Sequence, residues 1–292
     1  MHPTFDLGFI QIPAMGICIL IGTIFGLALL FFIRKYSYLS RDNILDSLLW
    51  AVLLGFVGMK ILYWITEPQI LVDTFTDFTF KKLYHLISEG MVFYGGLLGG
   101  ILGLVFCSLK TKKRFFAYSD LLAPCFCLAH AGGRIGCLMA GCCYGMEYDG
   151  ACHIVLSGVS RFPSPLAEFI LLIGMSVTLT LILRKSRHSG TVTAFYLIIY
   201  SVGRFILEFF RGDAERGFVG ALSTSQFISI FILLAGLVIL WISRKQPSDK
   251  PLPAEAETVV NDKELPQAET ADSAPDAEAD NTDATTRESD NK

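Results

Sequence analysis

Charged side chains are scarce in seven long segments of this 292-residue chain. Hydrophobic residues make up 52% of the sequence, and its mean hydropathy of +0.52 is too apolar for a soluble domain. A membrane-spanning helix needs about 20 mostly apolar residues. Seven segments have this character: 13–33, 48–66, 91–109, 115–140, 165–183, 190–210 and 224–243. We therefore expect an all-α integral membrane protein with seven transmembrane helices.

Several motifs are missing, and each absence excludes a class of site. The chain has no phosphate-binding P-loop, no dinucleotide fingerprint and no basic patch of the kind that binds nucleic acid. It has no pair of CxxC motifs, so we expect no metal and no cofactor. The residues before the first apolar segment include Asp6 and lack Lys and Arg, which is not typical of a signal peptide.

Acidic charge is concentrated at the C-terminal end. Residues 247–292 contain 13 Asp and Glu against 4 Lys and Arg, a net charge of −9, whereas residues 1–246 have a net charge of +6. The tail has almost no large apolar residues, so it cannot bury enough surface to offset the entropy lost on ordering. The sequence predicts a membrane domain over 1–246 and a disordered acidic tail over 247–292.

Basic residues follow the first, third, fifth and seventh apolar segments, whereas the other connections are mixed in charge. These residues are Arg34, Lys35, Arg41, Lys110, Lys112, Lys113, Arg114, Arg184, Lys185, Arg187, Arg244 and Lys245. By the positive-inside rule, the N-terminus is outside and the C-terminus with its tail is cytoplasmic. Segments 67–90 and 141–164 would then form a small extracytoplasmic head.

Arg134 is the most informative single residue, because it lies among glycines at the end of the fourth segment. An arginine at membrane depth costs at least ~2.5–3.5 kcal/mol, so something must stabilise it there. Its planar guanidinium fits a phosphate or carboxylate through two hydrogen bonds, which points to a phosphate-bearing ligand. The alternatives are an internal salt bridge or a side chain that reaches the membrane surface.

The sixth segment places polar residues on one helical face. They are Tyr200, Arg204, Glu208 and Arg211. Arg204 and Glu208 can form an ion pair. Counted with Arg134 and Lys60, the cations exceed what Glu208 and Asp120 can neutralise. We therefore expect an anionic ligand near the outer leaflet.

Three further features have both a structural and a functional interpretation. Gly95, Gly99 and Gly103 form a small-residue stripe with Gly96 beside it, which allows the close approach of another helix or of a lipid. His130 lies one turn before Arg134 and is either a general base or a neutral, hydrogen-bonded histidine. Asp120 is a candidate cap for its own helix.

Five of the eight cysteines fall within residues 125–143. Cys125 and Cys127 lie in an apolar segment, where small core residues are expected. Cys137, Cys142 and Cys143 lie near the predicted outer face, where disulfides can form. Structural, disulfide-bonded and reactive thiols all remain possible interpretations of these three.

With these features in place, the chain resembles the prolipoprotein diacylglyceryl transferases, integral enzymes of the bacterial inner membrane. The resemblance extends over most of residues 8–243. Its motifs are SDLLAP (119–124), GRIG (133–136), YG (144–145), PS (163–164) and YSVGRFILEFFR (200–211). Seven spans with the N-terminus outside are also the family's topology.

The resemblance implies transfer of the diacylglyceryl group of phosphatidylglycerol to a lipobox cysteine thiol of a prolipoprotein, with release of glycerol 1-phosphate. Arg134 and Arg204 would bind the phosphate and stabilise charge on the leaving group, while Tyr200 and Glu208 would orient the arginines. The other predicted contacts to phosphatidylglycerol are Gly95, Gly96, Gly145 and Lys60. The partners would be this lipid, the prolipoprotein signal peptide and the membrane.

The chain departs from the family's pattern in the half of the site that would handle the acceptor. Where the family has a histidine, this chain has Tyr94, a poor base because the ordinary tyrosine pKa is about 10. Either Tyr94 or His130 would have to replace that base. The family's two asparagines, its following acidic residue and an early tyrosine correspond to Cys137, Ala140, Cys142 and Met15. Two alternatives therefore stand beside this function. One is a divergent enzyme with another acceptor or a cysteine-based step, and the other is a non-catalytic lipid-binding protein.

Overall fold

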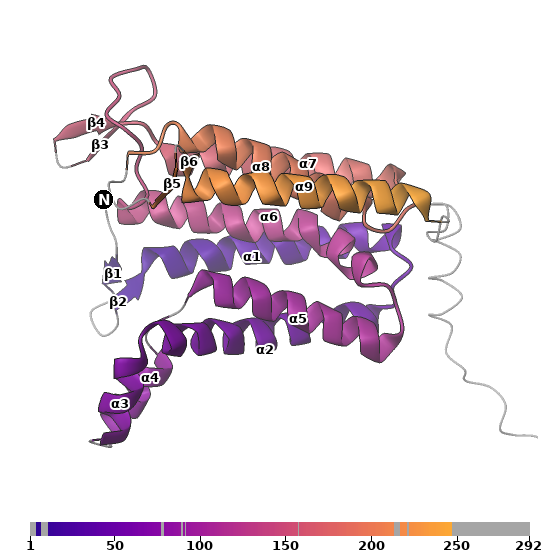
Figure 1. The fold of residues 1–292 in the computed structure, drawn as a ribbon, viewed down its shortest axis with the longest axis horizontal. Coiled ribbons are helices and arrows are strands. Elements are labelled where there is room, and N and C mark those ends of the chain that lie inside the picture. Colours follow the sequence, from indigo (N-terminus) through magenta and orange to yellow (C-terminus); the bar gives the residue numbers. More distant parts are fainter. Residues whose placement is uncertain are drawn as a thin grey trace, which may run out of the picture.

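The computed structural model describes residues 4–6, 11–76, 79–88, 90, 92–156, 158–212, 217–220 and 222–246. Seven long helices run roughly side by side through it (Figure 1). They are α1 Ala14–Ile33, α2 Arg41–Thr66, α5 Phe93–Thr111, α6 Phe115–Ala140, α7 Ser164–Lys185, α8 Thr191–Glu208 and α9 Thr224–Lys245. Each is long and apolar enough to cross a membrane. The predicted all-α membrane protein with seven spans is thereby confirmed.

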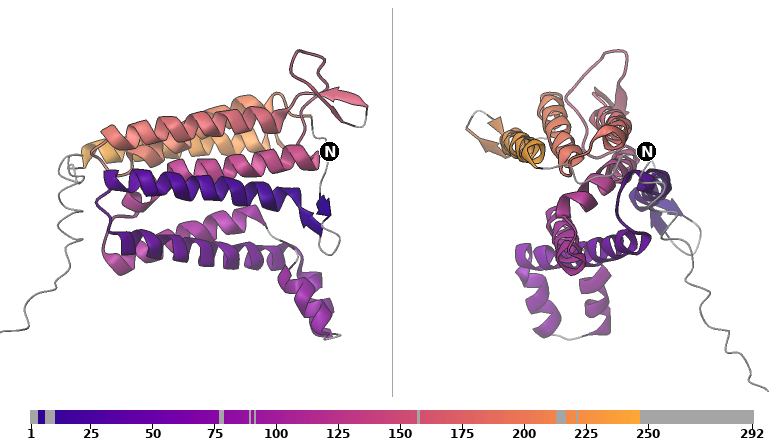
Figure 2. Two further views of the ribbon diagram at one scale, coloured as in Figure 1. Left: turned by 180° about the vertical axis from the view of Figure 1, so that it is seen from behind. Right: turned by 90° about the vertical axis from the view of Figure 1, so that its right-hand side faces the viewer.

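Short elements connect the spans. They are the 3-10 helix Arg34–Tyr36, helices α3 Pro68–Thr76 and α4 Phe80–Ser88, and the antiparallel strand pairs β1 Thr4–Asp6 with β2 Gln11–Pro13, β3 Ile154–Leu156 with β4 Val159–Arg161, and β5 Phe218–Val219 with β6 Leu222–Ser223. All except the 3-10 helix lie at the end of the bundle where α1 begins and α6 ends, here called the head end (Figures 1 and 2). The predicted tail over 247–292 lies outside the described residues.

The glycine stripe of α5 packs against α2. Cβ atoms at Gly95, Gly99 and Gly103 would overlap the backbone carbonyls of Gly58, Leu54 and Trp50. The α1–α6 pair uses the same device, with Gly22 against Gly132. Because lipid is as apolar as the helices, close backbone approach rather than the hydrophobic effect holds such pairs together. Of the two interpretations of the stripe, close approach of another helix or of a lipid, the structure shows the first.

Asp120 joins α6 to the start of α8. Its carboxylate is fully buried and accepts hydrogen bonds from the backbone N–H groups of Gly190 and Thr193 at 2.8 Å, and from the Thr193 hydroxyl at 2.7 Å. These groups belong to the first turn of α8, whose N-cap residue has no side chain of its own. The prediction that Asp120 caps its own helix was therefore wrong: it caps α8.

We predict that Gly99→Ala weakens the α2–α5 contact. The added methyl group would meet the Leu54 carbonyl, and overpacking of this kind costs about 1–3 kcal/mol. Gly174→Ala in α7 is the matched control, because nothing lies within 4 Å of its Cβ position. The stability of both variants is measured by their unfolding in detergent. Equal stability of the two variants would contradict this packing.

We predict that Asp120→Ala destabilises the protein by about 1–3 kcal/mol, because buried donors of α8 lose their acceptor. Asp46→Ala is the control, since the Asp46–Lys110 ion pair is exposed to solvent and such pairs contribute little. The midpoint of denaturant unfolding in detergent measures the difference. A loss as large for Asp46→Ala would show that the cap has no special role.

Candidate active site

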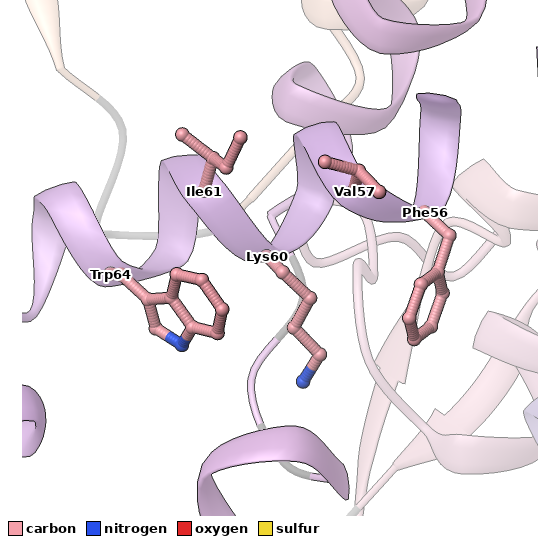
Figure 3. Close-up of a pocket in the computed structure, with 5 residues that line it drawn as sticks. All are labelled: Phe56, Val57, Lys60, Ile61 and Trp64. Carbon is pink, nitrogen blue, oxygen red and sulfur yellow. The ribbon is translucent and has the colours of Figure 1, made fainter. Parts of the chain in front are cut away.

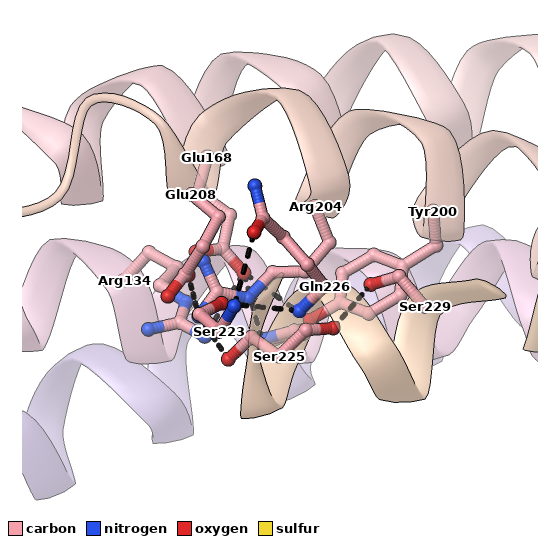
Figure 4. A network of polar contacts seen from close by, with 10 residues as sticks. Arg134, Glu168, Tyr200, Arg204, Glu208, Ser223, Ser225, Gln226 and Ser229 are labelled. Carbon is pink, nitrogen blue, oxygen red and sulfur yellow. Dashed lines mark hydrogen bonds and ion pairs between the residues drawn. The ribbon is translucent and has the colours of Figure 1, made fainter. Parts of the chain in front are cut away.

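An ion pair links α6 to α7 near the head end. The Arg134 guanidinium lies 2.9 Å from Oε1 of Glu168; the Glu168 side chain is buried and that of Arg134 is half-buried (Figure 4). The Tyr200 hydroxyl on α8 donates to the same carboxylate oxygen at 3.3 Å. The internal salt bridge that was one alternative for Arg134 is therefore present. Nε of Arg134 is also buried, and it has no hydrogen-bond partner among the described residues.

A second ion pair holds the arginine of α8. Arg204 lies 2.9 Å from Oε2 of Glu208, one turn later on the same helix, as the sequence predicted. It also donates to the Ser225 hydroxyl at 3.1 Å, in the first turn of α9 (Figure 4). A capping box of Ser223 and Gln226 begins that helix and fixes the position of Ser225. Arg204 is thereby held from two helices.

These five residues, Arg134, Glu168, Tyr200, Arg204 and Glu208, form one polar group that we call the arginine cluster. Tyr200 lies within electrostatic reach of both arginines. The cluster contains two cations and two anions, because Glu168 adds an anion that the count from the sequence did not include. Glu168 was missed, although it is the one charged residue in the apolar segment 165–183. The stronger indication of an anionic ligand is now the unused Nε of Arg134.

His130 lies against this cluster. Its Nε2 is 3.8 Å from Oε1 of Glu168, and its ring centroid is 5.7 Å from that of Tyr200. Nδ1 of His130 is buried and has no hydrogen-bond partner in the part of the chain that the structure describes. The histidine is therefore close enough to exchange a proton with a molecule bound at the cluster, and its role as a base stays a prediction.

Tyr94 and Lys60 lie outside the arginine cluster, although the Phe93 ring beside Tyr94 has its centroid 6.4 Å from that of His130. Tyr94 is 59% exposed at the start of α5, and its ring contacts that of Phe93. Lys60 lies on α2, which α1 and α6 separate from α8 (Figure 1). Its buried ammonium donates to the Gly90 carbonyl at 3.0 Å, beside a small pocket lined by Phe56, Val57, Ile61 and Trp64 (Figure 3). The structure does not place either residue in the arginine cluster.

The predicted glycine contacts have packing roles. A Cβ at Gly145 would lie 2.5 Å from the Phe162 carbonyl and 2.7 Å from that of Phe210, so protein backbone fills this space. Gly95 packs against α2, and a Cβ at Gly96 would meet the Met59 side chain. Contact of these glycines with a lipid stays a prediction.

Cys137, Cys142 and Cys143, here called the cysteine cluster, lie at the end of α6. Their three sulfur atoms are all within 4.8 Å of one another. Cys142 and Cys143 follow the helix, and their thiols differ in environment. Burial raises the pKa of Cys142, whereas a hydrogen bond from Cys137, together with the Arg211 and Arg134 guanidinium groups, lowers the pKa of Cys143.

An apolar groove of about 440 Å³ runs between α1, α6 and α7. Its lining residues are Cys18, Ile21, Gly22, Phe25, Leu128, Ala131, Gly132, Ile135, Phe169 and Ile173. Ile135 follows Arg134 in the chain, and Phe169 follows Glu168. The groove therefore begins beside the arginine cluster, an arrangement that suits a molecule with a charged head and an apolar tail. The groove could not be predicted from the sequence, because its residues come from three helices.

Comparison with known proteins agrees with this arrangement. The model of the prolipoprotein diacylglyceryl transferase family matches residues 3–242. The phosphatidylglycerol–prolipoprotein diacylglyceryl transferase 2 of Clostridium perfringens is 38% identical over 223 residues, which are 72% of this chain and 84% of the relative. The phosphatidylglycerol–prolipoprotein diacylglyceryl transferase of Clostridium tetani is 32% identical, over 82% of this chain and 96% of the relative. That of Pectobacterium atrosepticum is 30% identical, over 84% of this chain and 94% of the relative. The chain belongs to the prolipoprotein diacylglyceryl transferase family.

Proposed function

We propose that the chain transfers the diacylglyceryl group of phosphatidylglycerol to the lipobox cysteine thiol of a prolipoprotein. The observation that supports this most directly is the arginine cluster, in which two guanidinium groups from different helices face one polar site inside an apolar bundle. The names of the relatives give the donor and the acceptor class.

The donor would bind with its phosphate at the arginines. Arg134 has an unused buried N–H, and guanidinium groups suit phosphate because they offer several donors in a fixed plane. Glu168, Glu208 and Tyr200 would hold the arginines in place. An acyl chain would lie in the groove between α1, α6 and α7. The arginines would then stabilise the charge on the departing glycerol phosphate.

The same arrangement supports the proposed acceptor and membrane setting. The cluster lies near the head end, and the basic residues after α1, α5, α7 and α9 lie at the other end. With the positive-inside orientation, the head end is extracytoplasmic, and an exported prolipoprotein would reach it from the outer leaflet. The chain would act in the bacterial inner membrane, with residues 247–292 in the cytoplasm.

To test this, the chain replaces the single diacylglyceryl transferase of a bacterium that depends on this enzyme. The mass of a reporter lipoprotein from these cells is then measured. We expect a mass gain of one diacylglyceryl unit on the lipobox cysteine. An unmodified reporter, with the chain expressed and inserted, would contradict the proposal. A modified molecule other than the reporter would instead support the divergent enzyme with another acceptor, and lipid binding alone would support the non-catalytic protein.

In this assay we predict that Arg134→Ala and Arg204→Ala each reduce the rate of transfer by about 10²–10³-fold, the usual effect of removing one charge-stabilising donor. Lysine at either position should restore only part of the rate, because an ammonium group cannot bind phosphate in the two-point manner of a guanidinium. Quantitative mass spectrometry of the reporter over time measures the rate.

Arg114→Ala is the control for this pair, since Arg114 is exposed at the opposite end of α6 and bonds Gln246. The lysine variants keep the positive charge that pairs with each glutamate, so their folding should be preserved. A reduced rate in these variants therefore reports a loss of catalysis and not a loss of folding. Wild-type rates for both alanine variants would show that the arginines do not act on the donor.

A further inference from the structure

The cysteine cluster brings three potential metal ligands close together. Its three sulfur atoms lie within 4.8 Å of one another. In a tetrahedral zinc site with Zn–S bonds of about 2.3 Å, the sulfur atoms are separated by about 3.8 Å. Small side-chain rotations would bring the three thiols to that spacing. The site could not be predicted from the sequence, because a Cys-x4-Cys-Cys spacing is not one of the familiar zinc patterns.

The backbone explains how this spacing produces a cluster. Gly141 ends α6 in the left-handed conformation, with φ of 71°, and turns the chain back on the helix. The N–H of Cys142 then donates to the Cys137 carbonyl at 3.1 Å, which fixes the two residues against each other. Cys143 has a φ of 58°, an uncommon conformation for a residue other than glycine. These turns direct Cys142 and Cys143 towards Cys137.

The charges around the cluster favour bound thiolates. Arg134 lies within electrostatic reach of Cys137 and Cys143, and Arg211 within reach of Cys143. Three thiolates and one Zn²⁺ have a net charge of −1, which the neighbouring guanidinium groups offset. Three protein ligands also leave one tetrahedral position open, as in catalytic rather than structural zinc sites.

We propose that Cys137, Cys142 and Cys143 bind Zn²⁺ as a three-thiolate site, and that the open fourth position takes the thiol of the acceptor cysteine. The proposal rests on the proposed function for the identity of this acceptor. In this proposal the metal, and not Tyr94, activates the thiol. Tyr94 belongs to the acceptor half of the site, but it is exposed and lies outside the arginine cluster. Cys137 lies one helical turn after Arg134, so donor and acceptor would meet at the end of α6.

The reaction balances without a redox step. On binding, the acceptor thiol loses its proton to solvent and becomes a zinc thiolate. The sulfur attacks the glyceryl carbon that bears the phosphate, and a C–S bond forms as the C–O bond breaks. The electron pair of that bond leaves with the phosphate oxygen of glycerol phosphate. The thioether product is a weaker ligand than a thiolate and departs from the metal.

The first test is the metal content of the full chain, purified in detergent under reducing conditions. We expect equimolar zinc by mass spectrometry and loss of most of it in Cys137→Ser, Cys142→Ser and Cys143→Ser. Cys152→Ser is the matched control, because this exposed cysteine of the same region is outside the cluster and should leave the zinc content unchanged. Absence of zinc in the wild type, or equal zinc in all variants, would overturn the proposal.

The second test needs no variant. Co²⁺ in place of Zn²⁺ should give the intense visible and near-ultraviolet bands of tetrahedral thiolate coordination. A lipobox peptide with cysteine should shift these bands, and the same peptide with serine should not. Bands without a shift would overturn the role of the fourth position. A disulfide between any two of Cys137, Cys142 and Cys143, found by peptide mapping of the active protein, would overturn the site itself.

The two proposals can fail separately. Reporter lipidation by zinc-free enzyme at the wild-type rate would overturn the role of zinc in thiol activation and leave the transferase function standing. Equimolar zinc and a cysteine-dependent Co²⁺ spectrum in a chain that never modifies the reporter would support the site and contradict the function.

Discussion

Two arginines inside an apolar helical bundle must each be neutralised and hydrogen-bonded, and much of the structure serves that requirement. Arg134 joins α6 to α7 through Glu168, and Arg204 joins α8 to α9 through Ser225 while Glu208 balances its charge. Removing one partner of such a buried pair typically costs 3–5 kcal/mol, because the remaining charge stays buried. The same ion pairs that make the arginines tolerable therefore also fix the positions of four helices around one site.

The rest of the scaffold positions that site without adding charge to it. Glycines bring the backbones of α1 and α6 into direct contact, and those of α2 and α5 likewise. Asp120 completes the first turn of α8 from the opposite end of α6. The helix that bears Arg134 is thus connected to α1, α7 and α8, so a displacement of any of them would move the guanidinium. A site built on helices in this way is more exact than one built on loops.

The spans could be predicted from the sequence because helix length and hydropathy are local properties, and so could the Arg204–Glu208 pair, whose members are one turn apart. The partners of Arg134 and Asp120 could not, since Glu168 and Thr193 lie on other helices and nothing in the chain specifies which helices meet. Glu168 was visible as a lone charge in an apolar segment, but its partner was not. The cysteine cluster depends on two left-handed backbone conformations, at Gly141 and Cys143, that sequence spacing alone does not reveal.

In the proposed function, the phosphate of phosphatidylglycerol binds to the guanidinium groups of Arg134 and Arg204. Solid-state NMR of the full chain in phosphatidylglycerol bilayers tests it directly, through the dipolar coupling between lipid phosphorus and arginine Cζ carbons. We predict coupling that corresponds to direct hydrogen-bond contact, which Arg134→Lys and Arg204→Lys each remove in part. The opposite result would be phosphorus that couples only to the exposed basic residues at the other end of the bundle, with a spectrum unchanged in both lysine variants. That result would contradict binding of the phosphate at the two arginines.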